Sequence, residues 1–167
     1  MKYTDTQVTL AEIPDEITLA INISNCPYKC EECHSPELQT DVGEYLSTAI
    51  LDALIKNNKG ISCICFMGGD AYPREINFYM SYIRNNYPNL KTAIYSGARS
   101  MNRKINVHNL DYYKIGPYIK ELGGLNSLKT NQILYKVTHK SDTHCTLDNI
   151  NYKFIKNEFK DKDKNDK

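Results

Sequence analysis

The sequence has no long apolar run, no tryptophan and no excess of charge of one sign. Without a stretch of about 20 apolar residues it offers no candidate membrane span, and its opening residues, MKYTDTQVTLAEIPDE, lack the apolar core of a signal peptide. The 21 basic and 20 acidic side chains give a net charge of +1, which predicts no electrostatic binding to nucleic acid or to an acidic membrane. We therefore expect a cytoplasmic protein with neither a nucleic-acid partner nor a membrane partner.

The expected compartment also decides how the six cysteines are used, because cytosolic thiols stay reduced. We expect free thiols or ligands rather than disulfides. A length of 167 residues suits a single domain, which we assign to residues 1–150. The remaining residues, 151–167, are highly charged with little apolar content, and they are expected to form a flexible tail.

Hydrophobic patterns predict strands that alternate with helices. The expected strands are 17–24, 61–67, 91–97, 111–118 and 132–140, and the expected helices are 47–60, with Ser47 as N-cap, and 74–88. The second strand, ISCICFM, is apolar on both faces, which is typical of a buried parallel strand. The alternation predicts an α/β fold of βα units around a mostly parallel sheet.

Each of the first four strands is followed by an unusual loop. A cysteine-rich stretch follows the first, GGD the second, YSG ends the third and KIGPY ends the fourth. Function gathers at the carboxyl ends of parallel strands. We therefore expect the four loops to lie together at one edge of the sheet.

Residues 24–36, SNCPYKCEECHSP, contain three cysteines and a histidine within nine residues. A structural zinc site takes four ligands, usually as two separated pairs, and here the fourth ligand would be the adjacent His34 or a distant residue. A redox pair of Cys30 and Cys33 leaves Cys26 without a role. Three cysteines on one tight loop suit a [4Fe–4S] cluster with one iron free of protein ligands. We favour the cluster, and the zinc site and the redox pair remain alternatives.

The Cys-x3-Cys-x2-Cys spacing after the first strand resembles the signature of radical S-adenosylmethionine (SAM) enzymes. FMGGDAYP, at 66–73, resembles the Gly-Gly-Asp turn of one of their families, the anaerobic ribonucleoside-triphosphate reductase activating proteins. AIYSG, at 93–97, and the segment 111–137, with its Asn-Gln pair, resemble further parts of that family. The resemblance covers residues 19–137 and implies a partial, open βα barrel of the radical SAM type.

The resemblance implies that Cys26, Cys30 and Cys33 ligate three irons of the cluster and that SAM occupies the fourth. One electron, from a low-potential donor such as flavodoxin, would cleave SAM into methionine and a 5′-deoxyadenosyl radical. That radical would take a hydrogen atom from a glycine of the partner, the anaerobic (class III) ribonucleoside-triphosphate reductase. The protein itself would supply placement and exclude water and oxygen.

Further residues correspond to positions around SAM in that family. Gly68 and Gly69 lack a Cβ atom, so the backbone can approach the methionine part of SAM, and Asp70 can accept from its amino group. Taken alone, this Gly-Gly-Asp is also a plain turn before a helix. Ser96 either reaches the ribose or is a turn residue before a glycine. Lys114 either contacts the SAM carboxylate or is a solvated strand lysine.

Cys33 and its two neighbours correspond to the stretch beside bound SAM. His34 occupies the position of an aromatic residue or histidine that covers the cluster, or it is an exposed loop histidine. Glu32 departs from the family's pattern, which often has a small residue there. A carboxylate beside an anionic cluster is unfavourable unless it turns to solvent or contacts the sulfonium.

Three other cysteines have simpler interpretations. Cys63 and Cys65 share one face of a buried strand, and we expect them to pack in the core. Cys145, near His139 and His144, is interpreted as an ordinary thiol among surface residues rather than as part of a second metal site. Two alternatives to the whole functional hypothesis stay open: an activase of another glycyl radical enzyme, of the pyruvate formate-lyase type, and a non-catalytic zinc-binding adaptor.

Overall fold

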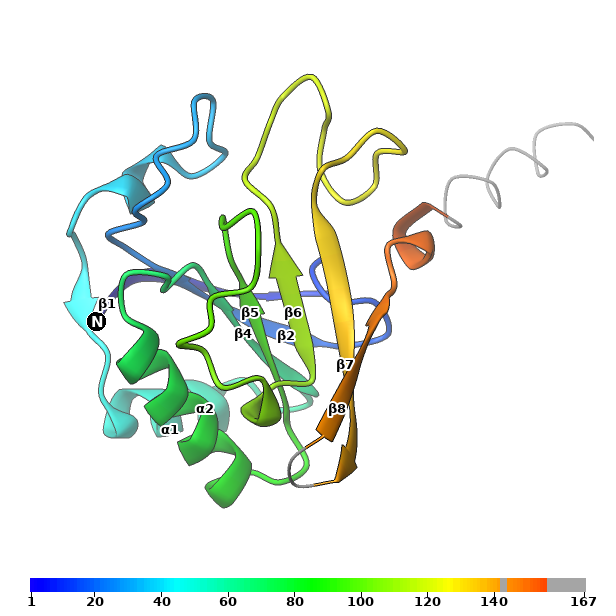
Figure 1. Cartoon of the computed structure of the whole chain (residues 1–167). Helices are drawn as coiled ribbons and strands as arrows, with labels where there is room; N and C mark the ends of the chain where they lie inside the picture. Colours follow the sequence, from blue (N-terminus) through cyan, green and yellow to red (C-terminus); the bar gives the residue numbers. More distant parts are fainter. Residues whose placement is uncertain (142–143, 156–167) are drawn as a thin grey trace, which may run out of the picture.

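The computed structural model describes residues 1–141 and 144–155 and places eight strands in one sheet (Figure 1). The strand order across the sheet is β3-β1-β2-β4-β5-β6-β7-β8. The strands are β1 (Lys2–Thr9), β2 (Thr18–Ile23), β3 (Glu44–Tyr45), β4 (Cys63–Met67), β5 (Lys91–Tyr95), β6 (Tyr112–Ile115), β7 (Ile133–Ser141) and β8 (His144–Asn149). The helices are α1 (Thr48–Asn57), α2 (Pro73–Asn86) and two 3₁₀ helices, η1 (Pro36–Gln39) and η2 (Val107–Asn109).

The centre of the sheet agrees with the predicted elements. β2, β4, β5 and β6 are neighbours and run parallel, and they lie within the first four predicted strands. The two predicted helices are present as α1 and α2, and the side chain of Ser47 caps α1 by accepting from the Ile50 backbone N–H at 3.2 Å. β4 is almost fully buried, as its continuous apolar sequence predicted.

The predicted open βα barrel is wrong, because the sheet is mixed. Four of the seven strand pairings are antiparallel. β1 and β8 were not predicted, and β7 runs back against β6 instead of parallel to the rest. A parallel neighbour needs a crossover connection, usually a helix. The described connection 116–132 between β6 and β7 contains no α-helix, so the chain returns beside β6 in the opposite direction.

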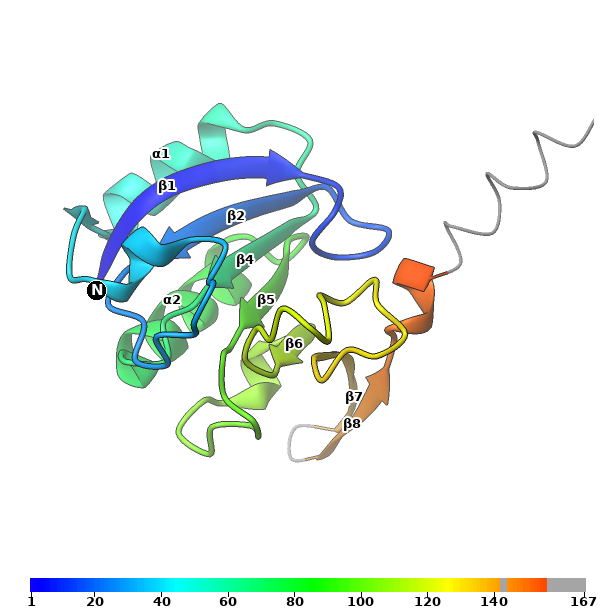
Figure 2. The same cartoon turned by 90° about the horizontal axis from the view of Figure 1, so that it is seen from above.

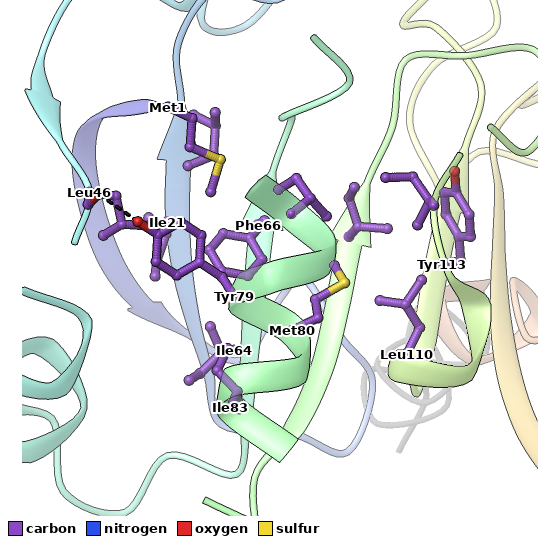
Figure 3. Close-up of a cluster of buried hydrophobic side chains, with 14 of the residues drawn as sticks. Met1, Ile21, Leu46, Ile64, Phe66, Tyr79, Met80, Ile83, Leu110 and Tyr113 are labelled. Atoms are coloured by element: carbon purple, nitrogen blue, oxygen red, sulfur yellow. Dashed lines mark hydrogen bonds between the residues drawn. The ribbon is translucent and has the colours of Figure 1, made fainter. Parts of the chain in front are cut away.

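Both α-helices lie on one face of the curved sheet, and the loops 10–17 and 116–132 lie over the other (Figure 2). Under the helices, apolar side chains of the strands pack against α2, among them Ile64 and Phe66 against Met80 and Ile83 (Figure 3). The Tyr79 hydroxyl donates to the backbone oxygen of Leu46, which anchors the segment before α1 on this core.

A second, smaller core lies on the face opposite the helices. Cys63 and Cys65 are fully buried in it, which confirms that they serve core packing. Phe154 packs against the same core, and the Asn151 side chain accepts from the backbone N–H of Leu134 at 2.8 Å. The first residues of the expected tail 151–167 therefore contact the sheet, and its residues 156–167 lie outside the described part.

No helix in the described ranges is both long enough and apolar enough to cross a membrane.

Candidate functional site

The four predicted loops do lie at one edge of the sheet, because β2, β4, β5 and β6 are parallel and adjacent. Backbone hydrogen bonds continue beyond the ends of the strands and join the loops to one another. The Gly68 N–H donates to the Tyr95 oxygen at 2.9 Å, and the Ser96 N–H donates to the Lys114 oxygen at 2.9 Å. The prediction that these four loops lie together is therefore confirmed, although the predicted overall fold is wrong.

The cysteine loop, residues 24–43, follows β2 and folds back on itself. The Cys26 N–H donates to the Leu38 oxygen at 2.8 Å, and the N–H of Cys33 donates to the Cys30 oxygen at 3.3 Å. Three of its non-glycine residues have positive φ values, which are costly for L-amino acids: Asn25, Lys29 and Glu32. All three cysteines are free thiols and partly exposed. The loop is thus a defined, strained structure that presents thiols at the edge of the sheet.

These cysteines fit an iron–sulfur cluster in ligand type, number and placement on one loop. Burial raises the pKa of Cys26, and hydrogen bonds from the backbone of Tyr28 and Lys29 act in the opposite direction by stabilising the thiolate. Within the described residues, however, no three His, Cys, Asp or Glu side chains are gathered as a metal-ligating group. The loop therefore offers three sulfur atoms as ligands, and in the described structure they are not gathered into one metal-ligating group.

The Gly-Gly-Asp turn follows β4 in a conformation that only glycine adopts easily. Gly68 and Gly69 have φ values of +100° and +94°. A Cβ atom on Gly69 would lie 2.6 Å from the Cδ1 atom of Ile76, and one on Gly68 would lie 3.2 Å from the Ile23 oxygen. The turn thus needs both glycines for its own geometry, apart from any close approach to a ligand.

Asp70 ends this turn and is buried, with only 8% of its surface exposed. The Ser96 hydroxyl donates to its Oδ1 atom at 2.6 Å, and the Gly97 N–H donates to its Oδ2 atom at 3.3 Å. Burial raises the pKa of Asp70, while these two hydrogen bonds and the charge of Lys114 oppose the rise. The Ser96 hydroxyl also accepts from the Ala98 N–H at 3.0 Å, so it is engaged within the turn and orients Asp70.

Lys114, on β6, is the most unusual charged residue at this edge. It is only 8% exposed, and its ammonium donates to the Gly116 oxygen at 2.8 Å. Burial lowers its pKa to about 8, although Cys30, Asp70 and Glu12 lie near enough to oppose that change. Among the described residues no carboxylate lies within ion-pair distance of it. A buried ammonium without a paired anion is costly, which makes Lys114 a candidate functional residue.

The ammonium lies beside a cavity on the face of the sheet opposite the helices. This cavity has a volume of ≈ 690 Å³, within the usual size of ligand pockets. Its wall includes Lys114, Met67 and Tyr95 from the strands and Cys33 and His34 from the cysteine loop. The cysteine loop and the buried ammonium therefore border one space large enough for a cofactor.

Glu32 and His34 connect the cysteine loop to the loop 116–132. The Glu32 carboxylate forms an ion pair with Lys120, and the His34 ring lies 4.2 Å from the ring of Tyr118, centroid to centroid. Glu32 is thus directed at a cation of the neighbouring loop, which stabilises its carboxylate. His34 is exposed and packs on an aromatic ring that also lines the cavity.

Sequence reasoning missed the contribution of the β1–β2 connection, residues 10–17, to the cavity wall. Glu12 and Leu10 line the cavity, and the Tyr95 hydroxyl donates to the backbone oxygen of Glu12. The available signal was the content of β-branched residues in β1, three threonines and one valine among eight residues, because a strand there would have indicated a hairpin with β2.

The structure places Cys145 on β8, opposite one of the two nearby histidines. Its partner across the β7–β8 pairing is His139, whose ring nitrogen Nε2 lies 2.9 Å from the Leu110 oxygen. Cys145 itself packs against the larger core. In the described residues these groups form no metal-ligating cluster.

Compared with known proteins, the chain matches no family model, no curated protein and no solved structure. The resemblance to the activating family therefore depends on the motifs at this edge of the sheet.

Proposed function

We propose that this protein cleaves SAM reductively at a [4Fe–4S] cluster and installs a glycyl radical on an anaerobic, class III ribonucleoside-triphosphate reductase. The observation that supports it most is the position of Lys114. Its buried ammonium has no ion-pair partner among the residues that the structure describes, and it borders a cavity of ≈ 690 Å³ that is also lined by Cys33. An anionic cluster and the SAM carboxylate would both compensate that charge.

In this proposal Cys26, Cys30 and Cys33 hold the cluster through their thiolates. The cluster would supply the electron that breaks the sulfonium bond of SAM, giving methionine and the 5′-deoxyadenosyl radical. Lys114, on β6 in the cavity wall, would bind the SAM carboxylate. Asp70, oriented by the Ser96 hydroxyl at 2.6 Å, would accept from the SAM amino group.

The open side of the cavity suits a glycine on a protein chain as the hydrogen donor. Part of its wall is formed by the connections 10–17 and 116–132 rather than by strands. Leu10 lies on that wall and is 75% exposed, so an apolar side chain is available to an incoming polypeptide. The radical formed inside would then be shielded by the partner during transfer.

The test is an electron paramagnetic resonance spectrum of a class III reductase after anaerobic incubation with this protein, SAM and dithionite. We expect the doublet of a glycyl radical, and we expect its loss with Cys30→Ala. An intact cluster that cleaves SAM without giving the doublet would favour an activase of another glycyl radical enzyme. A colourless protein that holds one zinc ion and leaves SAM intact would favour the zinc-binding adaptor and overturn the proposal.

A further inference from the structure

Four exposed cations gather beside the cysteine loop, although the whole chain is nearly neutral. Three lie on the connection between β5 and β6 and one lies in the first turn of α2; together they are called the basic surface: Arg74, Arg99, Arg103 and Lys104. Among the described residues none of the four forms an ion pair. The connection 96–110 contains no acidic residue to neutralise them.

The basic surface is fixed in place by hydrogen bonds between the β5–β6 connection and α2, beside which this connection runs (Figure 1). The Asn77 side chain donates to the Lys104 oxygen at 2.7 Å and accepts from the Asn106 N–H at 2.8 Å. Arg74 and Lys104 line the same surface hollow, whose wall also includes the acidic Glu75. Charges held on a defined backbone are arranged before a partner arrives, which reduces the entropic cost of binding.

Two contacts connect the segments that carry the basic surface to the cysteine loop. The ring of Tyr28 lies so close to Gly97 that a Cβ atom there would be 2.6 Å from its Cδ2 atom. The Asn25 amide donates to the hydroxyl of Tyr72 at 2.9 Å, and Tyr72 directly precedes α2. The hollow at the basic surface shares no lining residue with the cavity beside Lys114. A partner bound there would thus approach the cysteine loop without blocking the cavity.

We propose that the basic surface docks the acidic face of a redox protein that donates electrons to this chain. The inference rests on the proposed function, because it assumes a redox group on the cysteine loop. In each encounter the donor, a reduced low-potential flavoprotein, loses one electron and this chain gains it. Electron-transfer encounters are small and weak, and complementary charges steer them. Four exposed cations on a chain of net charge +1 fit such an encounter better than binding of nucleic acid, which needs a larger basic excess.

The test compares wild-type protein with Arg99→Glu/Arg103→Glu in binding to flavodoxin, an acidic flavoprotein, at low and at high salt. The control is Lys56→Glu/Lys59→Glu, which makes the same charge change at the end of α1. From there the chain enters the amino-terminal end of β4, so these two lysines lie away from the loops at the carboxyl ends of the strands. We expect the first variant to bind about tenfold more weakly at low salt and the control within about twofold of wild type. High salt should remove most of the difference.

A second readout separates this inference from the proposed function. With dithionite as reductant, Arg99→Glu/Arg103→Glu should cleave SAM as fast as wild type, and only the reaction driven by flavodoxin should slow. Unchanged flavodoxin binding in that variant would overturn the docking surface, as would tighter binding of wild type to a DNA duplex than to flavodoxin. Failure of the wild type to cleave SAM with dithionite would instead overturn the proposed function.

Discussion

At the scale of single residues, Lys114 is costly for folding. Its pKa of about 8 lies below the ordinary 10.5, so folding favours the neutral amine. The resulting loss of stability is fully present below pH 8, where the buried group is charged, and it disappears as the pH rises toward 10.5. A shift of this size corresponds to about 3 kcal/mol. A residue kept at such a cost is expected to have a function.

We predict that Lys114→Met raises the free energy of unfolding at pH 7 by about 1–3 kcal/mol. In this variant the Gly116 oxygen loses the hydrogen bond from the Lys114 ammonium, but it still accepts one from the Gln132 side-chain amide at 3.4 Å. Urea denaturation measures the change, and Lys56→Met on exposed α1 is the control, with little effect expected. A loss of stability in Lys114→Met would mean that the lysine has a structural role.

The same residue predicts how SAM binding depends on pH. The ammonium is charged below its pKa of about 8. If Lys114 binds the SAM carboxylate as proposed, that interaction should weaken as the pH rises above this value. Calorimetry should show affinity falling between pH 7 and pH 9 in wild type. In Lys114→Met the affinity should be at least about tenfold weaker at pH 7 and nearly independent of pH. Equal affinity and equal pH dependence in both proteins would exclude this lysine from the SAM site.

At the scale of elements, the turns at the strand ends are limited by backbone geometry. Gly116, after β6, has φ of +106°, and a Cβ atom on it would lie 2.8 Å from the Asn131 oxygen. We predict that Gly116→Ala lowers the free energy of unfolding by about 1–3 kcal/mol. Gly124→Ala is the matched control, because the nearest atom would be 3.7 Å away, and it should change stability by under about 0.5 kcal/mol. Comparable losses in the two variants would contradict this explanation.

The ion pair between Glu32 and Lys120 connects two loops and should affect local motion more than global stability. Both side chains are about half exposed, so Glu32→Gln should change the free energy of unfolding by under about 1 kcal/mol. Amide hydrogen exchange in residues 117–131 should become faster. Asp41→Asn, which removes the exposed ion pair with Lys2, is the control and should leave that exchange unchanged. No acceleration in Glu32→Gln would show that the ion pair does not restrain the loop.

Elements with a strong local signal could be predicted from the sequence, and those defined by long-range pairing could not. β4 and α1 have continuous or periodic apolar residues, and Ser47 marks the start of α1. β8 is an edge strand with mostly exposed residues, so it lacks the pattern of a half-buried strand. The direction of β7 depends on the connection 116–132, whose path no local pattern specifies. The ion pair between Glu32 and Lys120 joins residues 88 positions apart and could not be inferred either.

At the scale of the whole molecule, the mixed sheet predicts where unfolding begins. β4 and β5 are buried and have parallel neighbours on both sides, whereas β3 and β8 are the two edges. Hydrogen exchange followed by mass spectrometry should find the slowest amides in β4 and β5 and the fastest strand amides in β3 and β8. Fast exchange in β4 together with slow exchange in β8 would contradict the strand order.

The molecule as a whole separates two approaches to the cysteine loop. The cavity beside Lys114 opens on the face of the sheet opposite the helices, and the basic surface lies where the β5–β6 connection meets α2. A reaction that uses a small cofactor, an electron donor and a protein substrate needs such separate access. The described structure is consistent with one partner at each site.

The most direct measurement is the formation of 5′-deoxyadenosine by the full chain, reconstituted anaerobically with iron and sulfide, given SAM and dithionite, and compared with Cys33→Ala. If the protein cleaves SAM as proposed, we expect 5′-deoxyadenosine and methionine in equal amounts from wild type and neither from Cys33→Ala. A wild-type protein that is loaded with about four irons and leaves SAM intact would contradict the proposal.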